Sequence, residues 1–449
     1  MNKTLIRKYN VPGPRYTSYP AVPSWNQKPP TIAAWKQHVS QTFSATNESD
    51  GISLYIHLPY CESLCTYCGC NTRITVNHQV ELPYIEAVII EWQMYLAIFQ
   101  SKPNIAEIHL GGGTPTFFSP ENLRLLIDGI KSNAHVLPDA VLGFEAHPNS
   151  TSKEHLEVLY DLGFTRLSLG IQDFDHEVQT VVNRVQTFET VKLVVDQARA
   201  IGYTSINFDL IYGLPLQTIA TVKDTIEKTA ALKPDRIAFY SYAHVPWVKP
   251  GQRKFTELDL PEGDEKRALY ELGKEMFEAI GYLEIGMDHF SLPNDDLSQA
   301  MESGTLHRNF MGYTPKHSQL MVGLGVSSIS DSWGMFAQNV KTVEAYIGLI
   351  NEDVLPIFKG HKLSAEDKLT RKQILDLMCQ SETSWHPSND KVLIQSKLAE
   401  MESEGLVIID DYGVRITIEG KPFVRNVCMA FDTKLWAIDA DKEVFSKTV

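Results

Sequence analysis

Four of the six cysteines in this 449-residue chain lie within a segment of ten residues. They are spaced Cys61-x3-Cys65-x2-Cys68-x-Cys70 and follow a short apolar run at 53–59. Three thiolates on one short loop can bind three corners of a cubic iron–sulfur cluster, and the fourth iron then has no protein ligand. An iron with an open position can hold a small molecule and pass it an electron. The loop therefore predicts a catalytic cluster.

Disulfides and structural zinc are the alternatives for these cysteines. Six cysteines in 449 residues are too sparse for a small disulfide scaffold. Zinc sites with four cysteines usually use two Cys-x2-Cys pairs separated by a longer loop, and here only Cys65 and Cys68 have that spacing. A zinc-stabilised binding module stays open, although the spacing favours the cluster. Cys379 and Cys428 stand alone in apolar surroundings, as small core residues do.

The composition limits the partners of the chain. Its formal net charge is −14, from 41 basic and 55 acidic residues, which argues against a general affinity for nucleic acid. No apolar run approaches the ~20 residues that span a bilayer, and the start of the chain does not resemble a signal peptide. Free cysteines beside a cluster loop indicate a reducing compartment. We therefore expect a cytoplasmic monomer that binds neither membrane nor nucleic acid.

Strand and helix signals alternate between residues 53 and 246. Short apolar runs are typical of buried parallel strands, and they occupy 53–59, 106–113, 141–148, 166–174, 205–213 and 236–246. Amphipathic stretches between them predict helices at 82–99, 122–132, 153–162, 189–201 and 219–232. Six βα units with short loops predict an α/β fold with a partial (β/α)6 TIM-like barrel. A doubly wound open sheet is the alternative.

Polar residues follow the end of every expected strand. This pattern favours the barrel, because the loops at the carboxyl ends of barrel strands converge on one site. These residues are Tyr55 and His57, Gly111 to Thr114, Glu145 and His147, Gln172 and Asp173, Asp209, and Tyr242 and His244. The three consecutive glycines let the backbone approach a ligand closely, and they are not a dinucleotide-binding motif because Pro115 stands where a helix would start. We therefore expect the active site at this end of the barrel.

The cysteine loop and the glycine run together resemble the radical S-adenosylmethionine superfamily. Cys61, Cys65 and Cys68 match the three cluster ligands, and Tyr67 matches the aromatic residue before the last of them. The resemblance implies a [4Fe-4S] cluster whose open iron is chelated by S-adenosylmethionine. It also implies a 5′-deoxyadenosyl radical that takes a hydrogen atom from the substrate, while the protein positions that radical and excludes water.

Longer motifs extend the resemblance over nearly the whole chain. They occupy 8–20, 68–71, 109–116, 170–174, 209–215, 286–290, 307–310 and 425–429. All are similar to the oxygen-independent coproporphyrinogen III oxidase family. The resemblance implies an oxidoreductase of heme biosynthesis that decarboxylates two propionate side chains of coproporphyrinogen III to vinyl groups, giving protoporphyrinogen IX. It also implies a low-potential electron donor.

The family resemblance implies roles for individual residues. Tyr55, Gly112 and Glu145 resemble contacts to the cluster-bound S-adenosylmethionine, with Ile329 nearby. The positions that match contacts to a second S-adenosylmethionine are Tyr67, Gly113, Thr114, Gln172, Arg184, Asp209 and Ala243. We expect Tyr55, Glu145, Arg184 and Asp209 to form the catalytic set. Without the resemblance, Arg184 would be predicted to lie on the surface of a helix.

The implied substrate carries four carboxylates, so cationic partners are expected. Candidates are Arg15 and the pair His307-Arg308, with Tyr16 and Tyr19 as aromatics that face the porphyrinogen. The alternative is that the N-terminal segment packs on the barrel and that Arg15 pairs with an acidic residue.

Three further positions distinguish this chain. Cys70 is not needed as a cluster ligand. His147 stands where an acidic residue is expected, and Met311 stands where some members carry Gln. A related branch of the superfamily binds heme as a chaperone, and it resembles Cys-x3-Cys-x2-Cys-x-Phe without the long N-terminal segment. Cys70 and the segment around Arg15 therefore favour the enzyme over the chaperone.

We expect four parts along the chain: an N-terminal arm and helix (1–50), the barrel (51–250), a barrel extension with substrate-site residues (251–360) and a mainly helical C-terminal domain (361–449). In the last part, helices at 365–380 and 390–404 precede a hairpin at 406–417 that turns at 410–413. This order is typical of a winged helix, but Asp410, Asp411 and the acidic composition argue against DNA binding. We expect a cap over the mouth of the barrel.

Overall fold

The computed structural model describes residues 3–25, 29–247, 249–437, 445, 447 and 448. Its main element is one large curved sheet. Its 12 strands run in the order β16-β15-β14-β13-β1-β4-β5-β6-β7-β8-β10-β9. Six of these are parallel neighbours in chain order: β1 (Ile52–Leu58), β4 (Asn104–Gly112), β5 (His135–Ala146), β6 (Arg166–Gln172), β7 (Ser205–Tyr212) and β8 (Arg236–Ser241). All six predicted strands are therefore present, although their ends differ from the predicted ones.

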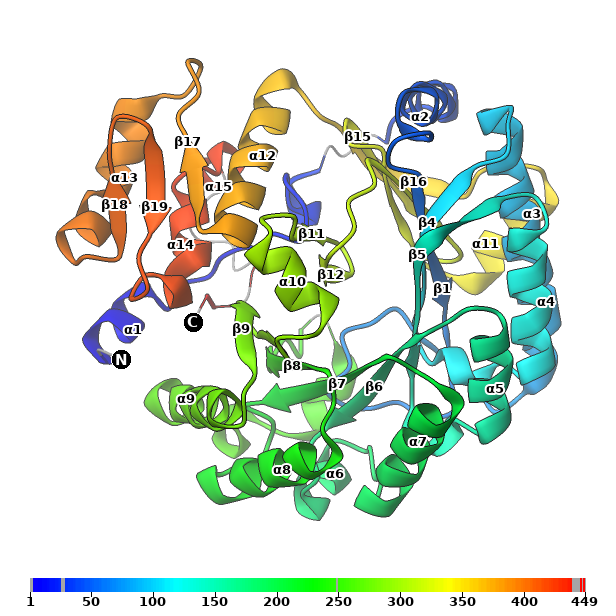
Figure 1. The fold of residues 1–449 in the computed structure, drawn as a ribbon, viewed down its shortest axis with the longest axis horizontal. Coiled ribbons are helices and arrows are strands. Elements are labelled where there is room, and N and C mark those ends of the chain that lie inside the picture. The colour runs from blue at the N-terminus through cyan, green and yellow to red at the C-terminus, as the bar shows by residue number, and fades with distance from the viewer. Residues whose placement is uncertain (1–2, 26–28, 248, 438–444, 446, 449) are drawn as a thin grey trace.

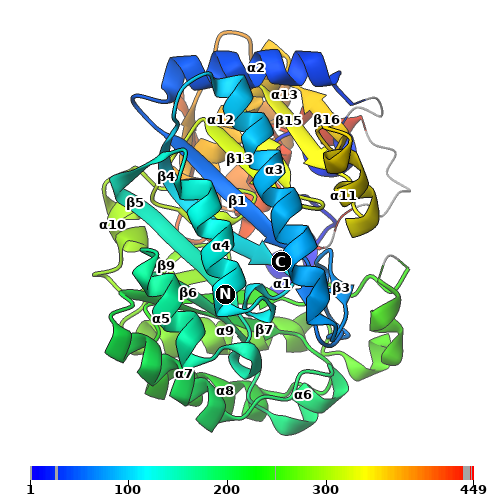
Figure 2. The ribbon, with the colours of Figure 1, turned by 90° about the vertical axis from the view of Figure 1, so that its right-hand side faces the viewer.

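The helices between these strands lie together on the outer face of the sheet, as Figure 1 and Figure 2 show. The predicted ones are α3 (Glu81–Phe99), α4 (Pro120–Lys131), α5 (Lys153–Asp161), α7 (Phe188–Ile201) and α8 (Ile219–Leu232). N-terminal capping residues mark where these helices begin. The Ser119 side chain accepts a hydrogen bond from the Asn122 amide at α4, and the Thr187 side chain accepts one from the Thr190 amide at α7. A doubly wound sheet would carry its helices on both faces, so the barrel-like interpretation holds. The short α6 (His176–Val181) was not predicted.

Helix α3 is more apolar than the sequence analysis allowed. With the turn before it, His78–Phe99 is long and apolar enough to cross a membrane by length and composition alone, and 50% of its most apolar window is buried in the fold. It contacts α2 (Ile32–Thr46), α4 and α11 (Val343–Asn351) and buries Tyr84 and Trp92 completely. The expectation that no apolar run approaches ~20 residues was therefore wrong, because a helix covered by protein on several sides is apolar over most of its surface.

The sheet continues on both sides of the parallel strands. Beyond β1 lie β13 (Leu320–Leu324), β14 (Ile329–Asp331), β15 (Met335–Asn339) and β16 (Ile357–Lys362), and beyond β8 lie β10 (His289–Ser291) and β9 (Leu283–Gly286). Of these added strands, β13 alone runs parallel to its neighbour in the central sheet, β1. The remaining helices and strands are α1 (Lys3–Tyr9), β2 (Tyr60–Cys61), β3 (Arg73–Ile74), α9 (Gly263–Ala279), α10 (Asp296–Glu302), β11 (His307–Asn309), β12 (Gly312–Thr314), α14 (Val424–Met429) and α15 (Thr433–Trp436).

A buried carboxylate fastens β13 to the central sheet. Glu91 on α3 accepts hydrogen bonds from the Gly325 amide at 2.8 Å, the Asn339 side chain at 2.7 Å and the Tyr346 hydroxyl at 2.6 Å. Burial raises the pKa of Glu91 to about 7, and these three hydrogen bonds work in the opposite direction. One acidic side chain on an apolar helix therefore holds the turn after β13, strand β15 and helix α11 in place.

A second core joins the two ends of the chain. The expected C-terminal helices and hairpin are present as α12 (Ala365–Gln380), α13 (Lys391–Ser403), β18 (Val407–Ile409) and β19 (Gly413–Ile416), and β17 (Glu382–Ser384) completes a small sheet. Arg425 on α14 donates to the carbonyl of Pro14 at 2.9 Å and to that of Gly13. Tyr16 and Tyr19 are buried in the same core. The N-terminal segment therefore packs mainly on the C-terminal region.

Replacing Glu91 with Leu should destabilise the fold strongly. The substitution leaves the buried Gly325 amide and the Tyr346 hydroxyl without an acceptor and removes one of the acceptors of the Asn339 side chain. An unpaired buried donor costs about 1–3 kcal/mol. We expect a loss of about 3 kcal/mol or more in the free energy of unfolding, measured by urea denaturation. Glu86→Leu on the exposed face of the same helix is the control and should change it by less than about 0.5 kcal/mol. Equal effects of the two variants would contradict this role of Glu91.

Candidate active site

The cysteine loop follows β1 and lies against the carboxyl ends of the neighbouring strands. Its four cysteines are free thiols. The Cys61 Sγ lies 3.3 Å from the hydroxyl of Thr114, which follows the glycine run after β4. The Arg184 Nη1 donates to the Cys65 Sγ at 3.6 Å. Two residues predicted to contact the second S-adenosylmethionine therefore lie directly beside the predicted cluster ligands.

Two backbone hydrogen bonds connect the loop region to distant parts of the chain. The Gly113 amide donates to the carbonyl of Leu58 at 2.8 Å, which fixes the glycine run against the end of β1. The Thr66 amide donates to the carbonyl of Val182 at 2.9 Å, which fixes the middle of the loop to the segment after α6. The position of the thiols thus depends on strand order as well as on the loop itself.

Gln252 is a positioning residue that sequence reasoning missed. Its side chain is 1% exposed. Its Nε2 contacts the carbonyl of Tyr67 at 3.1 Å and that of Ala243 at 3.2 Å, and its Oε1 accepts from the Val245 amide at 2.6 Å. It therefore joins the loop to the segment after β8, and both carbonyls belong to residues predicted to contact the cofactor. No motif marks a glutamine in this turn, so the sequence offered no signal for it.

Glu145 at the end of β5 is the centre of a half-buried polar group. Its Oε1 lies 3.3 Å from the Nε2 of His109, and its Oε2 accepts from the Gly112 amide at 3.3 Å. The ring of Tyr55 stacks on that of His109 with centroids 6.1 Å apart. Although burial works in the opposite direction, His109 holds the pKa of Glu145 below its usual value, and Glu145 raises the pKa of His109. The contact therefore favours the ionised form of Glu145 and the protonated form of His109. His109 was not among the predicted site residues, although it lies two residues before the glycine run.

Arg184 lies inside the site, so its interpretation as a surface arginine is wrong. Its Nη2 donates to the carbonyl of Gly170 at 2.6 Å, and its Nε is covered without a partner among the described residues. A Cβ on Gly170 would lie 2.7 Å from that Nη2 and 2.9 Å from the Nε2 of Gln172, so Arg184 and Gln172 meet at the end of β6. Burial and the charge of Arg184 lower the pKa of His147 to about 3. The residue that replaces the expected acid is therefore neutral and leaves the charge of Arg184 free for a ligand.

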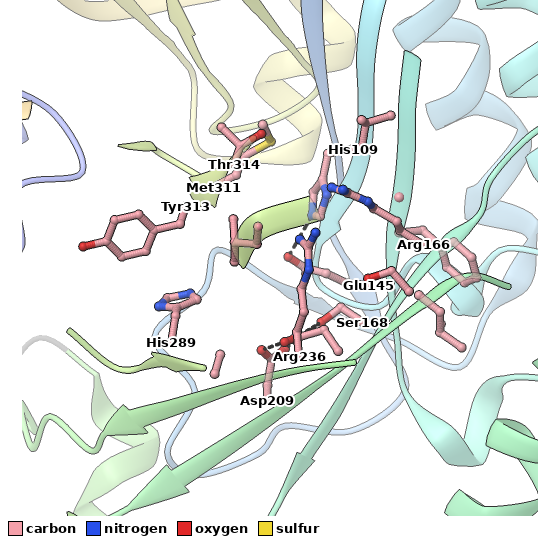
Figure 3. Close-up of a pocket in the computed structure, with 18 of the residues that line it drawn as sticks. His109, Glu145, Arg166, Ser168, Asp209, Arg236, His289, Met311, Tyr313 and Thr314 are labelled. Carbon is pink, nitrogen blue, oxygen red and sulfur yellow. Dashed lines mark hydrogen bonds and ion pairs between the residues drawn. The ribbon is translucent and has the colours of Figure 1, made fainter. Parts of the chain in front are cut away.

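The parallel strands β1 and β4 to β8 form a partial barrel, which we call the half-barrel. A cavity of about 150 Å³ lies inside it, and Figure 3 shows lining side chains that come from β4 to β12. Glu145, Asp209 and Met311 all line it. Asp209 accepts from the Ser168 hydroxyl at 3.1 Å and from the Asn207 amide group at 2.9 Å. Burial, and then the nearby charge of Glu145, raises the pKa of Asp209 to about 6. The two carboxylates predicted for the catalytic set therefore line the same cavity.

Some residues singled out from the sequence lie elsewhere. Asp173 accepts from the Thr225 hydroxyl at 3.0 Å and helps to hold α8 against the sheet. The side chain of Ile329 packs on a small core around Trp25. Tyr16 and Tyr19 are each 2% exposed inside the C-terminal core, so the prediction that they face a porphyrinogen is wrong. The sequence of the N-terminal segment does not indicate which hydrophobic core its aromatic residues will join.

The residues around the loop fit the cluster and the S-adenosylmethionine that the motifs imply. Among the described residues, no three His, Cys, Asp or Glu side chains converge closely enough for one metal ion. Thiols that bind different irons of one cluster do not need to converge on a single point. The covered, unpartnered Nε of Arg184 suits a carboxylate ligand. Gly112, at φ +118°, has no side chain, so its backbone is open to a ligand beside Glu145.

Replacing Gly112 with Ala should disturb the site strongly. The new Cβ would lie 2.8 Å from the His57 ring, and the φ of +118° disfavours any side chain. We expect a loss of about 1–3 kcal/mol in the free energy of unfolding, seen as a lower thermal midpoint. Gly69→Ala in the same region is the matched control, because a Cβ there meets nothing within 4 Å. Unchanged midpoints for both variants would contradict the close approach at Gly112.

Comparisons with known proteins agree with this geometry. Residues 55–229 match the model of the radical SAM superfamily. The oxygen-independent coproporphyrinogen III oxidase of Pseudomonas aeruginosa is 36% identical over 456 residues, covering 99% of this chain and 98% of that protein. The corresponding protein of Escherichia coli is 36% identical over 440 residues, covering 96% of this chain and 95% of that protein.

A solved structure agrees over the same length. The coproporphyrinogen III oxidase of Escherichia coli, described as a radical SAM enzyme, superposes with a TM-score of 0.89 at 34% identity and covers 96% of this chain and 98% of that one. The N-terminal segment, the half-barrel and the C-terminal region are thus all shared. This chain belongs to the oxygen-independent coproporphyrinogen III oxidase family of the radical SAM superfamily.

Proposed function

We propose that this chain decarboxylates two propionate side chains of coproporphyrinogen III to vinyl groups without oxygen, giving protoporphyrinogen IX in heme biosynthesis. One observation carries the proposal: relatives named for this activity are 36% identical over 99% of the chain. The cysteine loop and the carboxylates Glu145 and Asp209 lie at the ends of the strands that this shared fold places together.

The cluster and its ligand would be held by the residues described above. Cys61, Cys65 and Cys68 would bind one [4Fe-4S] cluster. The Gly112 backbone and Glu145 would receive the amino group of S-adenosylmethionine, because a carboxylate held below its usual pKa accepts hydrogen bonds readily. When bound, the cluster and S-adenosylmethionine supply a 5′-deoxyadenosyl radical that takes a hydrogen atom from the propionate β-carbon.

A second S-adenosylmethionine is part of the proposal. The positions that would contact it are Tyr67, Gly113, Thr114, Gln172, Arg184, Asp209 and Ala243. The free Nε of Arg184 supports a bound carboxylate, and Asp209, whose pKa is about 6, is mostly ionised at neutral pH and can accept from hydroxyls or an amino group. Two molecules also match the stoichiometry, because each vinyl group requires the removal of one hydrogen atom.

The chain's own part in the reaction is to enclose and orient the side chain. After the hydrogen atom is removed, the bond to the carboxylate breaks, carbon dioxide leaves, one electron passes to a one-electron acceptor, and a carbon–carbon double bond forms. Glu145 and Asp209 both line the half-barrel cavity, where the side chain would be held. We further propose that the protein acts as a cytoplasmic monomer that receives electrons from a low-potential donor and binds neither membrane nor nucleic acid.

An anaerobic assay tests the activity. The protein is reconstituted with iron and sulfide and mixed with coproporphyrinogen III, S-adenosylmethionine and dithionite. We expect 5′-deoxyadenosine and products that have lost one and then two carboxyl groups, measured by liquid chromatography and mass spectrometry. Tight binding of one heme per chain, with neither product, would favour the heme chaperone instead. The comparisons give that alternative no support.

The iron content of cysteine variants tests the ligands. Reconstituted wild-type protein should hold about four iron atoms per chain. Cys65→Ser should lose most of this iron, because it removes a ligand of one corner. Cys70→Ser should keep it, because Cys70 lies next to the cluster-binding residues without being needed as a ligand. Loss of iron in Cys70→Ser would show that the ligand set is assigned wrongly.

A further inference from the structure

A buried arginine with unused donors lies beside the half-barrel cavity. Arg308 on β11 is 5% exposed, and its Nε and Nη1 have no hydrogen-bond partner among the described residues. Its Nη2 makes one long contact of 3.5 Å with the carbonyl of Arg15. Buried guanidinium groups are normally paired, because the charge is costly to remove from water. The unused donors therefore indicate an anion that binds here.

The charges around Arg308 are not balanced by the protein. We call the group of Arg15, Lys266, Asp288, Arg308 and Arg425 the Asp288 cluster. Asp288 is its one carboxylate, and it pairs with the Arg15 Nη2 at 2.9 Å. Within the part of the chain that the structure describes, Arg425 and Lys266 donate hydrogen bonds to backbone carbonyls and to no carboxylate. The positive charges of the cluster therefore outnumber its negative charge, in a chain whose net charge is −14.

The pKa values of the cluster follow from the same excess of positive charge. Although burial opposes it, the hydrogen bond from His289 and the charges of Arg15 and Arg308 hold the pKa of Asp288 well below its usual value. Burial, followed by the charge of Arg15, lowers the pKa of Lys266 to about 8 and that of Arg425 to about 10. A bound anion would relieve this mutual repulsion.

The two arginines lie against the wall of the cavity. The guanidinium of Arg308 lies over the ring of Tyr313, 4.5 Å from its centroid, and that of Arg15 lies 5.9 Å from the centroid of Tyr240. Tyr240 and Tyr313 both line the cavity that Glu145 and Asp209 share. Figure 3 shows Tyr313 and the nearby His289 across the cavity from the strand ends. The side chain of Arg15 is 37% exposed, so an anion can reach it.

We propose that Arg308 and Arg15 bind a propionate carboxylate of the porphyrinogen, with Asp288 positioning Arg15. This inference rests on the proposed function. The carboxylate bound here is one that the product keeps. Two guanidinium groups stabilise the anionic carboxylate, and that stabilisation is lost when the group leaves as carbon dioxide, so binding a reacting carboxylate in this way would raise the barrier. Holding a retained propionate at the Asp288 cluster instead turns the other side of the macrocycle toward the strand ends.

Binding of stable porphyrins to the cluster-loaded protein tests the site. Coproporphyrin III is the fluorescent, oxidised form of the substrate, and its tetramethyl ester lacks the charges. We expect wild-type protein to bind the tetraacid more tightly than the ester. Arg308→Gln should weaken binding of the tetraacid by about 10- to 100-fold, as expected when a charge-assisted pair is lost, and should leave binding of the ester unchanged. Arg308→Lys keeps the positive charge but lacks the paired N–H donors of the guanidinium, so its affinity for the tetraacid should lie between those of wild type and Arg308→Gln.

Kinetics and controls complete the test. Arg308→Gln should raise KM for coproporphyrinogen III more than it lowers kcat, because the contact is kept in both ground and transition states. The exposed Arg124→Gln, whose side chain is 43% exposed, is the matched control and should behave as wild type. Arg15→Gln should weaken binding of the tetraacid several-fold, and it tests the site even where Arg308→Gln does not fold.

Two outcomes separate the failure of this inference from that of the proposed function. Wild-type affinity for the tetraacid in both Arg308→Gln and Arg15→Gln would overturn the anion site while leaving the decarboxylase assignment intact. Wild-type protein that neither binds coproporphyrin III nor converts coproporphyrinogen III would instead overturn the proposed function on which the site rests.

Discussion

The attachment of the cysteine loop to the carboxyl ends of the parallel strands is the constraint on which the active site depends. A short loop with three thiols has no fixed shape of its own, and here contacts from several βα units hold it. Gly113 binds the end of β1, Val182 binds the middle of the loop, and Gln252 joins the loop to the segment after β8. The cluster site therefore requires the whole half-barrel, which explains why chemistry and fold are conserved together over the full length of the relatives described above.

The distribution of charge inside the half-barrel separates two tasks. The carboxylates of Glu145 and Asp209 lie at the strand ends with His109, and burial together with the charge of Glu145 raises the pKa of Asp209. Arg15 and Arg308 lie around Asp288, whereas Arg166 and Arg236, which also line the cavity, are paired with Asp295 and Asp296. A macrocycle with four negative groups would be repelled by the first region and attracted by the second. This arrangement orients a large anion in a protein whose overall charge is negative.

The sequence was sufficient for features that depend on local patterns and insufficient for those that depend on distant pairing. Each of the six parallel strands was visible as a short run rich in apolar residues, because every one of them buries apolar side chains in the core. The insertion of β13 beside β1 was not visible, because its pairing depends on the carboxylate of Glu91 on a helix far away in the chain. For the same reason the site residues with motifs were found, whereas Gln252 was missed and Tyr16 was assigned to the wrong surroundings.

Electron paramagnetic resonance of the reduced, cluster-loaded protein asks most directly whether one iron of the cluster is open to a ligand. Spectra recorded with and without S-adenosylmethionine should differ in their g values, because binding of its amino and carboxylate groups changes the ligands of that iron. The change should be absent when S-adenosylmethionine is replaced by adenosine, which lacks both groups. Identical spectra with and without S-adenosylmethionine would contradict the open iron and the radical chemistry inferred from it.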